Sequence, residues 1–391
     1  MKHSSLRRRR LAALLIALAL VVAACGDDDA GSGGESAGAA AAAETDPDAV
    51  CGDEAATDPA DLEPGRAVAR CPAGAPAPEP LDERTEIRFA TAVAGEFVAP
   101  LLLADSMGEF ERENLDVEIV TLPFADAIAQ MQAGNLDGST GSLEASLYNA
   151  VASGIDLRWV AGNFFPPDAG DTDVPQSGLW VRNDVFSDPD DPDLAELDGA
   201  RFGSNVGFAS ATTYFIAEAL DGSGITPADL EIVQVPSADQ VTALQNDAID
   251  AAWLVDPFWI SIADDPDFTL VATQTPGEPM GGFFFGPSLY EENREAGVAF
   301  LRAIIRTINT YLADDYQDDR DVVAAIADAT EAPEEAILDT PPLVFDWEIR
   351  AGSTDRSQEA FLALDRLEAS EPVPEDELVD RSLYTDAVGA G

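Results

Sequence analysis

The stretch Pro123–Leu147, PFADAIAQMQAGNLDGSTGSLEASL, carries the pattern that decides the fold. Apolar residues at helical spacing stop at Gly134, and a short extended run follows at residues 136–138. Residues 139–142 form a polar turn in this interpretation, and a second helical pattern begins after them. The stretch therefore predicts a helix, a strand, a turn and a helix.

The same pattern returns 113 residues later. Residues 245–253 align with residues 132–140 without a gap, so that Asp250 matches Asp137 and Trp253 matches Thr140. Two such units predict two similar α/β lobes, each of which brings a strand end and a helix start to a common place. In open α/β sheets, ligands bind at the carboxyl ends of the strands.

The first residues have the pattern of a bacterial lipoprotein signal. Four arginines precede the apolar residues 11–24, which are too few to span a bilayer that needs about 20. The segment ends in Val22-Ala23-Ala24-Cys25, which resembles a lipobox and implies cleavage before Cys25, lipidation of its sulfur and anchoring on the extracytoplasmic side. The alternative is an ordinary secretory signal with a coincidental cysteine. Both Sec and twin-arginine export remain open.

Residues 25–81 are rich in Gly, Ala, Asp, Glu and Pro and predict a flexible, acidic, lipidated tether. The chain has three cysteines. Once Cys25 is lipidated, Cys51 and Cys71 are the only remaining pair, and disulfides persist in an exported chain. We therefore expect a Cys51–Cys71 disulfide; the alternative is two free thiols.

Beyond the tether, alternating strand and helix patterns predict an α/β protein of two lobes, each with a mixed, mostly parallel sheet flanked by helices. We expect lobe I to comprise residues 82–182 and 282–391 and lobe II to comprise residues 183–281, with two crossovers between them. The expected strands are 86–90, 117–120, 157–161, 179–181, 201–203, 232–235 and 281–285, and the expected helices include 100–113, 210–220, 238–246 and 293–312.

Charge and missing residue types exclude several functions. Removal of the signal would leave 16 basic and 74 acidic residues, a net charge of −58, which argues against a nucleic-acid partner and for a solvated, salt-tolerant surface. His3 and Lys2 would leave with the signal, so histidine-dependent catalysis, histidine metal sites and Schiff-base chemistry are not expected. We expect no enzyme activity, no metal and no cofactor, and the residue inventory favours binding.

Several short motifs lie between residues 85 and 256. They are Ala104–Phe110 before a Leu-Asp-Val strand, Gln132–Asp137, Ala152–Asp156, and Ile249–Trp253 followed by Asp256–Phe258. These residues resemble solute-binding lipoproteins of ABC importers, most of all the branch that binds sulfonates, nitrate and thiamine-precursor pyrimidines. The resemblance implies a two-lobed periplasmic-binding-protein fold (type II), a monomer that closes on a small molecule, and a membrane permease with its ATPase as partners.

The ligand-binding residues should come from loops that follow the strands. Each candidate also has a structural alternative: a turn for Gly95, helix capping for the hydroxyls and Asp256, and a core position for Trp253. The predicted set is Gly95, Glu96, Phe97, Ser139, Thr140, Ser142, Phe164, Ser210, Thr212, Thr213, Trp253 and Asp256.

Rings and carboxylates dominate this set, and Arg158 and Arg182 are the only arginines expected near it. A flat nitrogen heterocycle that stacks on rings and donates hydrogen bonds to carboxylates fits this mixture better than a sulfonate, taurine or nitrate. The alternatives are a binding protein for those anions and a tethered sensor domain that reports its ligand to another partner.

Overall fold

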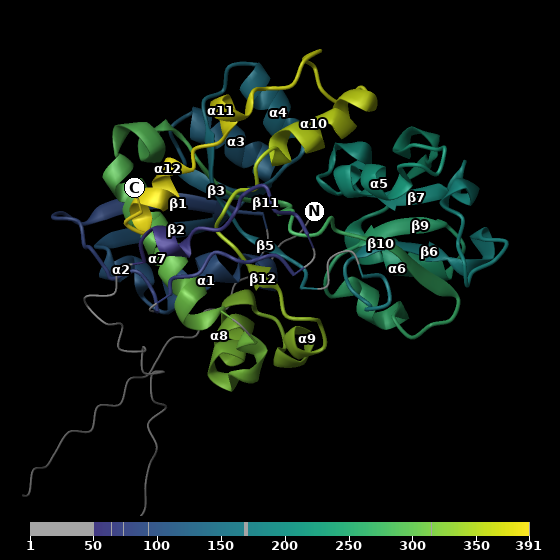
Figure 1. Ribbon diagram of the computed structural model, residues 1–391, viewed down its shortest axis with the longest axis horizontal. Coiled ribbons are helices and arrows are strands. Elements are labelled where there is room, and N and C mark those ends of the chain that lie inside the picture. Colours follow the sequence, from purple (N-terminus) through teal and green to yellow (C-terminus); the bar gives the residue numbers. More distant parts are fainter. Residues whose placement is uncertain are drawn as a thin grey trace, which may run out of the picture. The chain divides into compact units, whose positions relative to one another are not determined.

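The computed structural model describes residues 51–63, 65–72, 74–92, 94–167, 171–313 and 315–390. The predicted signal segment and Cys25 lie outside these residues. Two five-stranded sheets with helices against them form the two lobes (Figure 1). Within the described ranges, no helix combines the length and the apolar character that a membrane span requires.

The lobe I sheet has the strand order β2-β1-β3-β11-β4. The strand β1 runs parallel to both β2 and β3, while β11 is antiparallel to β3 and β4. The bounds are Thr85–Thr91 for β1, Leu115–Thr121 for β2, Gly138–Ser142 for β3, Arg158–Gly162 for β4 and Gly281–Phe285 for β11.

The lobe II sheet repeats this topology. Its strands β8, β7, β9, β6 and β10 take the places of β2, β1, β3, β11 and β4, with the same parallel and antiparallel pairings. The repeated sequence pattern therefore does correspond to two similar lobes. The bounds are Gly178–Arg182 for β6, Arg201–Ser204 for β7, Glu231–Gln234 for β8, Ala251–Leu254 for β9 and Phe268–Thr273 for β10.

The matched aspartates of the repeat perform the same structural task in both lobes. The carboxylate of Asp137 accepts a 2.8 Å hydrogen bond from the backbone N–H of Arg88, and Asp250 accepts a 2.8 Å bond from that of Arg201. Each aspartate thus satisfies a backbone donor of the neighbouring parallel strand and fixes the position of the strand that follows it.

Three boundaries differ from the sequence-based expectation. The strand β3 covers residues 138–142, so Ser139–Ser142 form a strand and not a polar turn. The expected helix 100–113 is divided at Gly108, which has a positive φ of 73°. The strand β6 pairs with β9 and β10, so the first crossover precedes Gly178 instead of lying near Asn183.

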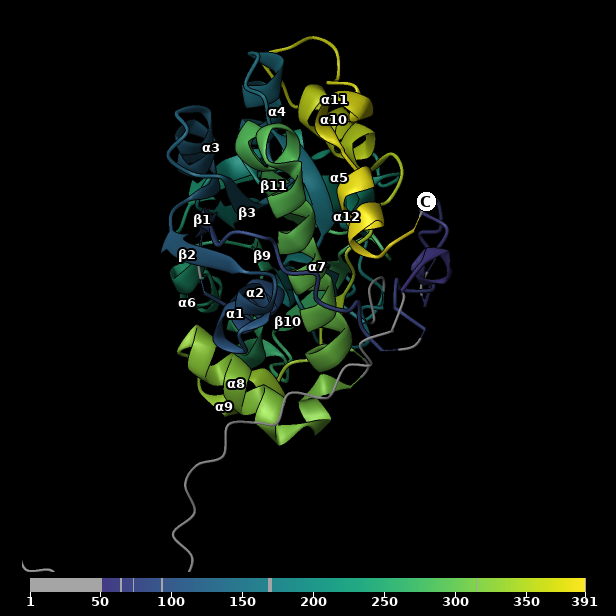
Figure 2. The same cartoon turned by 90° about the vertical axis from the view of Figure 1, so that its left-hand side faces the viewer.

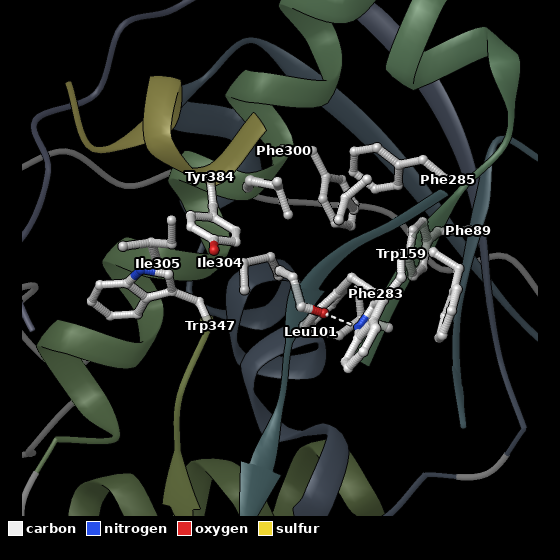
Figure 3. Close-up of a cluster of buried hydrophobic side chains, with 14 of the residues drawn as sticks. Phe89, Leu101, Trp159, Phe283, Phe285, Phe300, Ile304, Ile305, Trp347 and Tyr384 are labelled. Carbon is white, nitrogen blue, oxygen red and sulfur yellow. Dashed lines mark hydrogen bonds between the residues drawn. The ribbon is translucent and has the colours of Figure 1, made fainter. Parts of the chain in front are cut away.

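An aromatic cluster forms the centre of lobe I (Figure 3). The ring of Phe300 stacks on Phe89, with centroids 4.7 Å apart, and contacts Phe285 edge-on at 5.6 Å. Phe300 lies on α7, Arg294–Tyr311, a long helix that Figure 2 shows beside the lobe I strands. Its apolar face, which includes Phe300, Ile304 and Ile308, is buried. Burial of each such ring stabilises the fold by roughly 1.5–3 kcal/mol.

The described part of the expected tether is packed onto lobe I. Cys51 and Cys71 form the expected disulfide, and both are buried in the lobe I core. Arg66 is buried as well; its guanidinium donates to the carboxylate of Asp346 at 2.7 Å and to the backbone oxygen of Gly277 at 2.9 Å. The described residues of the segment are therefore closed into a loop by an internal disulfide and held on the lobe by a buried ion pair, in contrast to the flexible coil expected from the composition.

The C-terminal helices contact both lobes. We expected them to pack on lobe I, but α10 also packs against α5 of lobe II, and its Arg356 donates to Glu278 in the second crossover at 2.5 Å. The remaining bounds are Ala99–Ser106 for α1, Glu109–Arg112 for α2, Phe124–Gln132 for α3, Ala145–Ala152 for α4, Thr212–Leu220 for α5, Gln240–Gln245 for α6, Arg320–Thr330 for α8, Glu334–Leu338 for α9, Ser353–Ala363 for α10, Glu375–Leu378 for α11 and Ser382–Ala387 for α12, with the short strands Phe164–Phe165 (β5) and Val344–Phe345 (β12).

Candidate functional site

Two carboxylates from different lobes lie near one another, each in the segment that follows a strand of its sheet. Glu96 belongs to the short 3-10 helix Glu96–Val98 after β1, and Asp256 follows the end of β9 in lobe II. The charge of Asp256 raises the pKa of Glu96, so the two groups are within electrostatic range of each other. We call Glu96, Phe97, Asn163, Phe164, Asp256 and Tyr316 the interlobe cluster.

Burial and a neighbouring negative charge raise the pKa of Glu96 above the ordinary value of a glutamate. Desolvation raises the pKa of Glu96 to about 7, with a further contribution from Asp256. The hydroxyl of Tyr316 donates a 2.6 Å hydrogen bond to Glu96 Oε1, which acts in the opposite direction. Near neutral pH the Glu96 carboxyl can therefore gain or lose a proton.

Asp256 is held by tryptophan and serine donors. Its Oδ1 accepts a 2.5 Å hydrogen bond from Trp259 Nε1. Burial raises the pKa of Asp256, while the bonds from Trp259 and Ser177 oppose this. The alternative assignment of Asp256 as a helix cap has no support here, because no side chain caps the 3-10 helix Phe258–Ile262.

Rings and an amide complete the cluster on lobe I. Phe97 and Phe164 are both partly buried, with ring centroids 5.9 Å apart. The amide of Asn163 donates a 2.6 Å hydrogen bond to the backbone oxygen of Phe97, while its Oδ1 is buried without a hydrogen-bond partner. Gly95 precedes this segment, and a Cβ atom there would lie 2.7 Å from the Phe97 ring. Gly95 therefore leaves room for the ring.

The predicted hydroxyls of lobe I lie in or at the end of the sheet. Ser139 is fully buried within hydrogen-bond distance of the Ala90 backbone oxygen, and Thr140 donates a 2.8 Å bond to Thr91. Ser142, at the strand end, donates to Glu144 at 3.2 Å. These contacts account for the hydroxyls as structural groups, since β3 extends further than the sequence indicated.

The predicted hydroxyls of lobe II surround the start of α5. Ser210 and Thr212 are partly exposed and contact each other at 3.2 Å. Thr213 is fully buried, and its hydroxyl has no hydrogen-bond partner among the described residues. Of the three, Ser210 and Thr212 are the ones accessible to a ligand.

Trp253 lies in the apolar interior of lobe II. Its ring stacks on Phe215 of α5, with centroids 5.6 Å apart, and only 6% of the residue is exposed. This packing agrees with the alternative that Trp253 is a core residue of lobe II. The indole Nε1, however, is buried without a hydrogen-bond partner among the described residues, which leaves one donor available.

The two arginines expected near the site lie at the opposite ends of their strands. Arg158 begins β4, the strand that leads to Asn163, and pairs with Asp156 at 2.8 Å. Arg182 ends β6 beside the start of β9, where it pairs with Asp247 at 2.8 Å. Neither belongs to the interlobe cluster.

Sequence reasoning missed Asn163 and Tyr316 as members of the cluster. Asn163 directly precedes the predicted Phe164, so its neighbourhood was a signal for it, whereas Tyr316 is 220 residues from Glu96 and has no local motif. Among the described residues, no group of three acidic or cysteine side chains could hold a metal ion.

Comparisons with known proteins agree with this architecture. Residues 183–328 match the model of the NMT1-like family. Among curated protein sequences, none matches the chain. The alkanesulfonate-binding protein of Xanthomonas axonopodis pv. citri, bound to MOPS, covers 77% of this chain with all of its own length, at a TM-score of 0.57 and 17% identity.

Two further solved structures are similar over comparable lengths. The periplasmic aliphatic sulphonate-binding protein of Escherichia coli has a TM-score of 0.55 and 16% identity and covers 76% of this chain and 92% of its own. The periplasmic nitrate-binding protein of Synechocystis PCC 6803 has a TM-score of 0.58 and 14% identity and covers 80% of this chain and 90% of its own. The chain thus has the periplasmic-binding-protein fold and resembles the branch expected from its motifs.

Proposed function

We propose that the protein is an extracytoplasmic solute-binding protein of an ABC importer, which captures a small molecule between its lobes and delivers it to a permease and ATPase. The observation that carries the proposal is the approach of Glu96, which follows β1 of lobe I, and Asp256, which follows β9 of lobe II, in two lobes of matching topology. Ligands of open α/β sheets bind at such strand ends, and two chain crossovers between the lobes allow hinge closure.

The ligand class that fits best is a flat nitrogen heterocycle. Phe97 and Phe164 supply ring faces, and Glu96 and Asp256 supply hydrogen-bond acceptors. A sulfonate or nitrate is the second candidate, because those are the ligands named for the similar structures. We infer a binding function without chemistry on the ligand.

A lipid anchor on Cys25 would hold the protein at the outer side of the membrane. If the lipobox is used, Cys25→Ala should release the protein into the soluble fraction, because the anchor forms on that sulfur. Fractionation of cells that express the full chain tests this, with the unmodified chain as the control. A Cys25→Ala protein that stays with the membrane would show that something else anchors it.

A thermal-shift screen tests the proposed function. Pyrimidines, flavins, taurine, alkyl sulfonates and nitrate are added to the exported chain, and a ligand that binds only the folded state raises the melting temperature. We expect one of these ligand classes to stabilise the chain. If the indole N–H of Trp253 contacts the ligand, the Trp253→Phe variant should bind that class more weakly. A chain that none of these classes stabilises would contradict the proposal.

A further inference from the structure

We propose that the interlobe cluster takes a cation, specifically a planar ligand with a protonated nitrogen, and not an oxoanion. The inference rests on the proposed function, since it assumes that the ligand binds between the lobes. Its basis is the kind of atom that the cluster holds. Glu96 and Asn163 of lobe I and Asp256 of lobe II are acceptors, Asp256 acts electrostatically on Glu96, and the amide oxygen of Asn163 has no partner among the described residues.

The unpartnered acceptor is the amide oxygen of Asn163. Its amide orientation follows from its neighbour, because the side-chain nitrogen must face the backbone oxygen of Phe97, to which it donates at 2.6 Å. The oxygen therefore points elsewhere and, with only 6% of Asn163 exposed, lacks a hydrogen bond from any described residue. A buried acceptor of this kind is costly unless something donates to it.

The two carboxylates can also accept further hydrogen bonds. Glu96 accepts a hydrogen bond from Tyr316 and has Gln317 and Thr340 as further hydrogen-bonding neighbours, and Asp256 accepts from Trp259 and Ser177. Each ionised carboxylate accepts about four hydrogen bonds. The ion pairs of the described residues do not include either group, so the cluster has no arginine to neutralise it.

Electrostatics then decide the sign of the ligand. An oxoanion would be repelled by the ionised forms of Glu96 and Asp256 in a partly buried place, where solvent screens charges poorly, and its binding would require both carboxyls to be protonated. A cation would be attracted by the same carboxylates. Burial and Asp256 raise the pKa of Glu96, and a bound positive charge would lower that pKa again by stabilising the ionised form of Glu96.

The rings determine the shape of the ligand. Phe97 and Phe164 are inclined to each other by 40° with centroids 5.9 Å apart, and Phe97 is adjacent to Glu96 in the chain. A planar cation that donates to Glu96 can therefore place its π-face on a ring, where aromatic quadrupoles attract positive charge. A compact spherical cation would use the carboxylates alone.

Three compounds of nearly the same shape and different charge test the proposal: benzamidine, benzamide and benzoate. Titration calorimetry of the exported chain with each should give a benzamidine affinity at least about tenfold above that of benzoate, the equivalent of one charge-assisted hydrogen bond. Glu96→Gln and Asp256→Asn should each reduce the benzamidine affinity about tenfold or more and leave benzamide nearly unchanged. Glu86→Gln, which changes an exposed glutamate on β1, should have no effect.

The outcomes separate this inference from the proposed function. If ethanesulfonate, nitrate or benzoate binds more tightly than benzamidine and Glu96→Gln strengthens that binding, the solute-binding function stands and the charge assignment is overturned. If benzamidine fails to bind at millimolar concentration, the charge assignment is also overturned. Circular dichroism of each variant shows that it is folded, so a lost affinity can be attributed to the site.

Discussion

Glu96 occupies a place where an ionised carboxylate is costly, and its protonation should be visible in stability. Because the folded-state pKa of about 7 exceeds the ordinary value of 4.5, the folded chain holds this proton more strongly than the unfolded chain. Stability from Glu96 is therefore greatest below about pH 4.5 and is lost as the pH rises through 7.

Replacement of Glu96 by glutamine should remove this loss. The glutamine side chain cannot ionise but can still accept from Tyr316, so the Glu96→Gln variant should be more stable than the unmodified chain at pH 8 by about 1–3 kcal/mol and nearly equal to it at pH 4.5. Urea unfolding at both pH values measures the difference, and Glu86→Gln provides the exposed control. A variant that is less stable at pH 8 would contradict this account of Glu96.

At this scale the sequence indicated some members of the interlobe cluster and not others. Glu96, Phe97, Phe164 and Asp256 could be proposed from the sequence because they follow expected strands, and their role in ligand binding stays a prediction. The interior position of Trp253 could not, because its place near a strand end also fits a ligand-facing residue, and only the packing of Phe215 distinguishes the two. Tyr316 reaches Glu96 through tertiary folding that no local pattern encodes.

At the scale of elements, a buried ion-pair network joins α2 to α7. Arg306 is fully buried and donates 2.6 Å hydrogen bonds to both Glu109 and Glu113, which are also buried. Arg306→Met would leave two buried carboxylates without this partner and should cost about 3–5 kcal/mol of folding free energy.

Chemical denaturation measures this cost, with Arg320→Met as the matched control. Arg320 is exposed at the start of α8, and surface substitutions usually change stability by less than about 0.5 kcal/mol. If Arg306→Met costs no more than the control, the network does not stabilise the joint between α2 and α7.

The strands were more predictable in type than in extent. The residues of β3, GSTGS, are small and polar and therefore indicated a turn. They form a strand because they pair with β1 and β11. The sheet packs against large rings there: a Cβ atom at Gly138 would lie 2.4 Å from Phe89, and one at Gly141 would lie 2.3 Å from Phe124. Small residues are required there by neighbours that lie elsewhere in the sequence.

For the molecule as a whole, the net charge of −53 should make stability depend on salt. Repulsion among surface carboxylates weakens as the Debye length falls from about 10 Å at 0.1 M to about 3 Å at 1 M. The melting temperature should therefore rise across a sodium chloride series. Potassium chloride should reproduce the series if screening is the cause, and a flat or falling series would contradict charge repulsion as a leading contribution.

The N-terminal segment shows the limit of composition at this scale. Residues 51–81 are poor in large apolar side chains, and the sequence therefore indicated a coil. Their order depends on a disulfide and on the partners of Arg66, which lie more than 200 residues away at Gly277 and Asp346. The fold of the two lobes was predictable because each lobe repeats a local pattern.

The central claim is that two matching lobes close on a ligand held by Glu96 and Asp256. Small-angle X-ray scattering of the exported chain with and without saturating benzamidine tests it most directly. We predict that the radius of gyration falls on binding, and that the double variant Glu96→Gln, Asp256→Asn shows no such change at the same concentration. Binding that leaves the radius of gyration unchanged, or compaction that persists in the double variant, would contradict the claim.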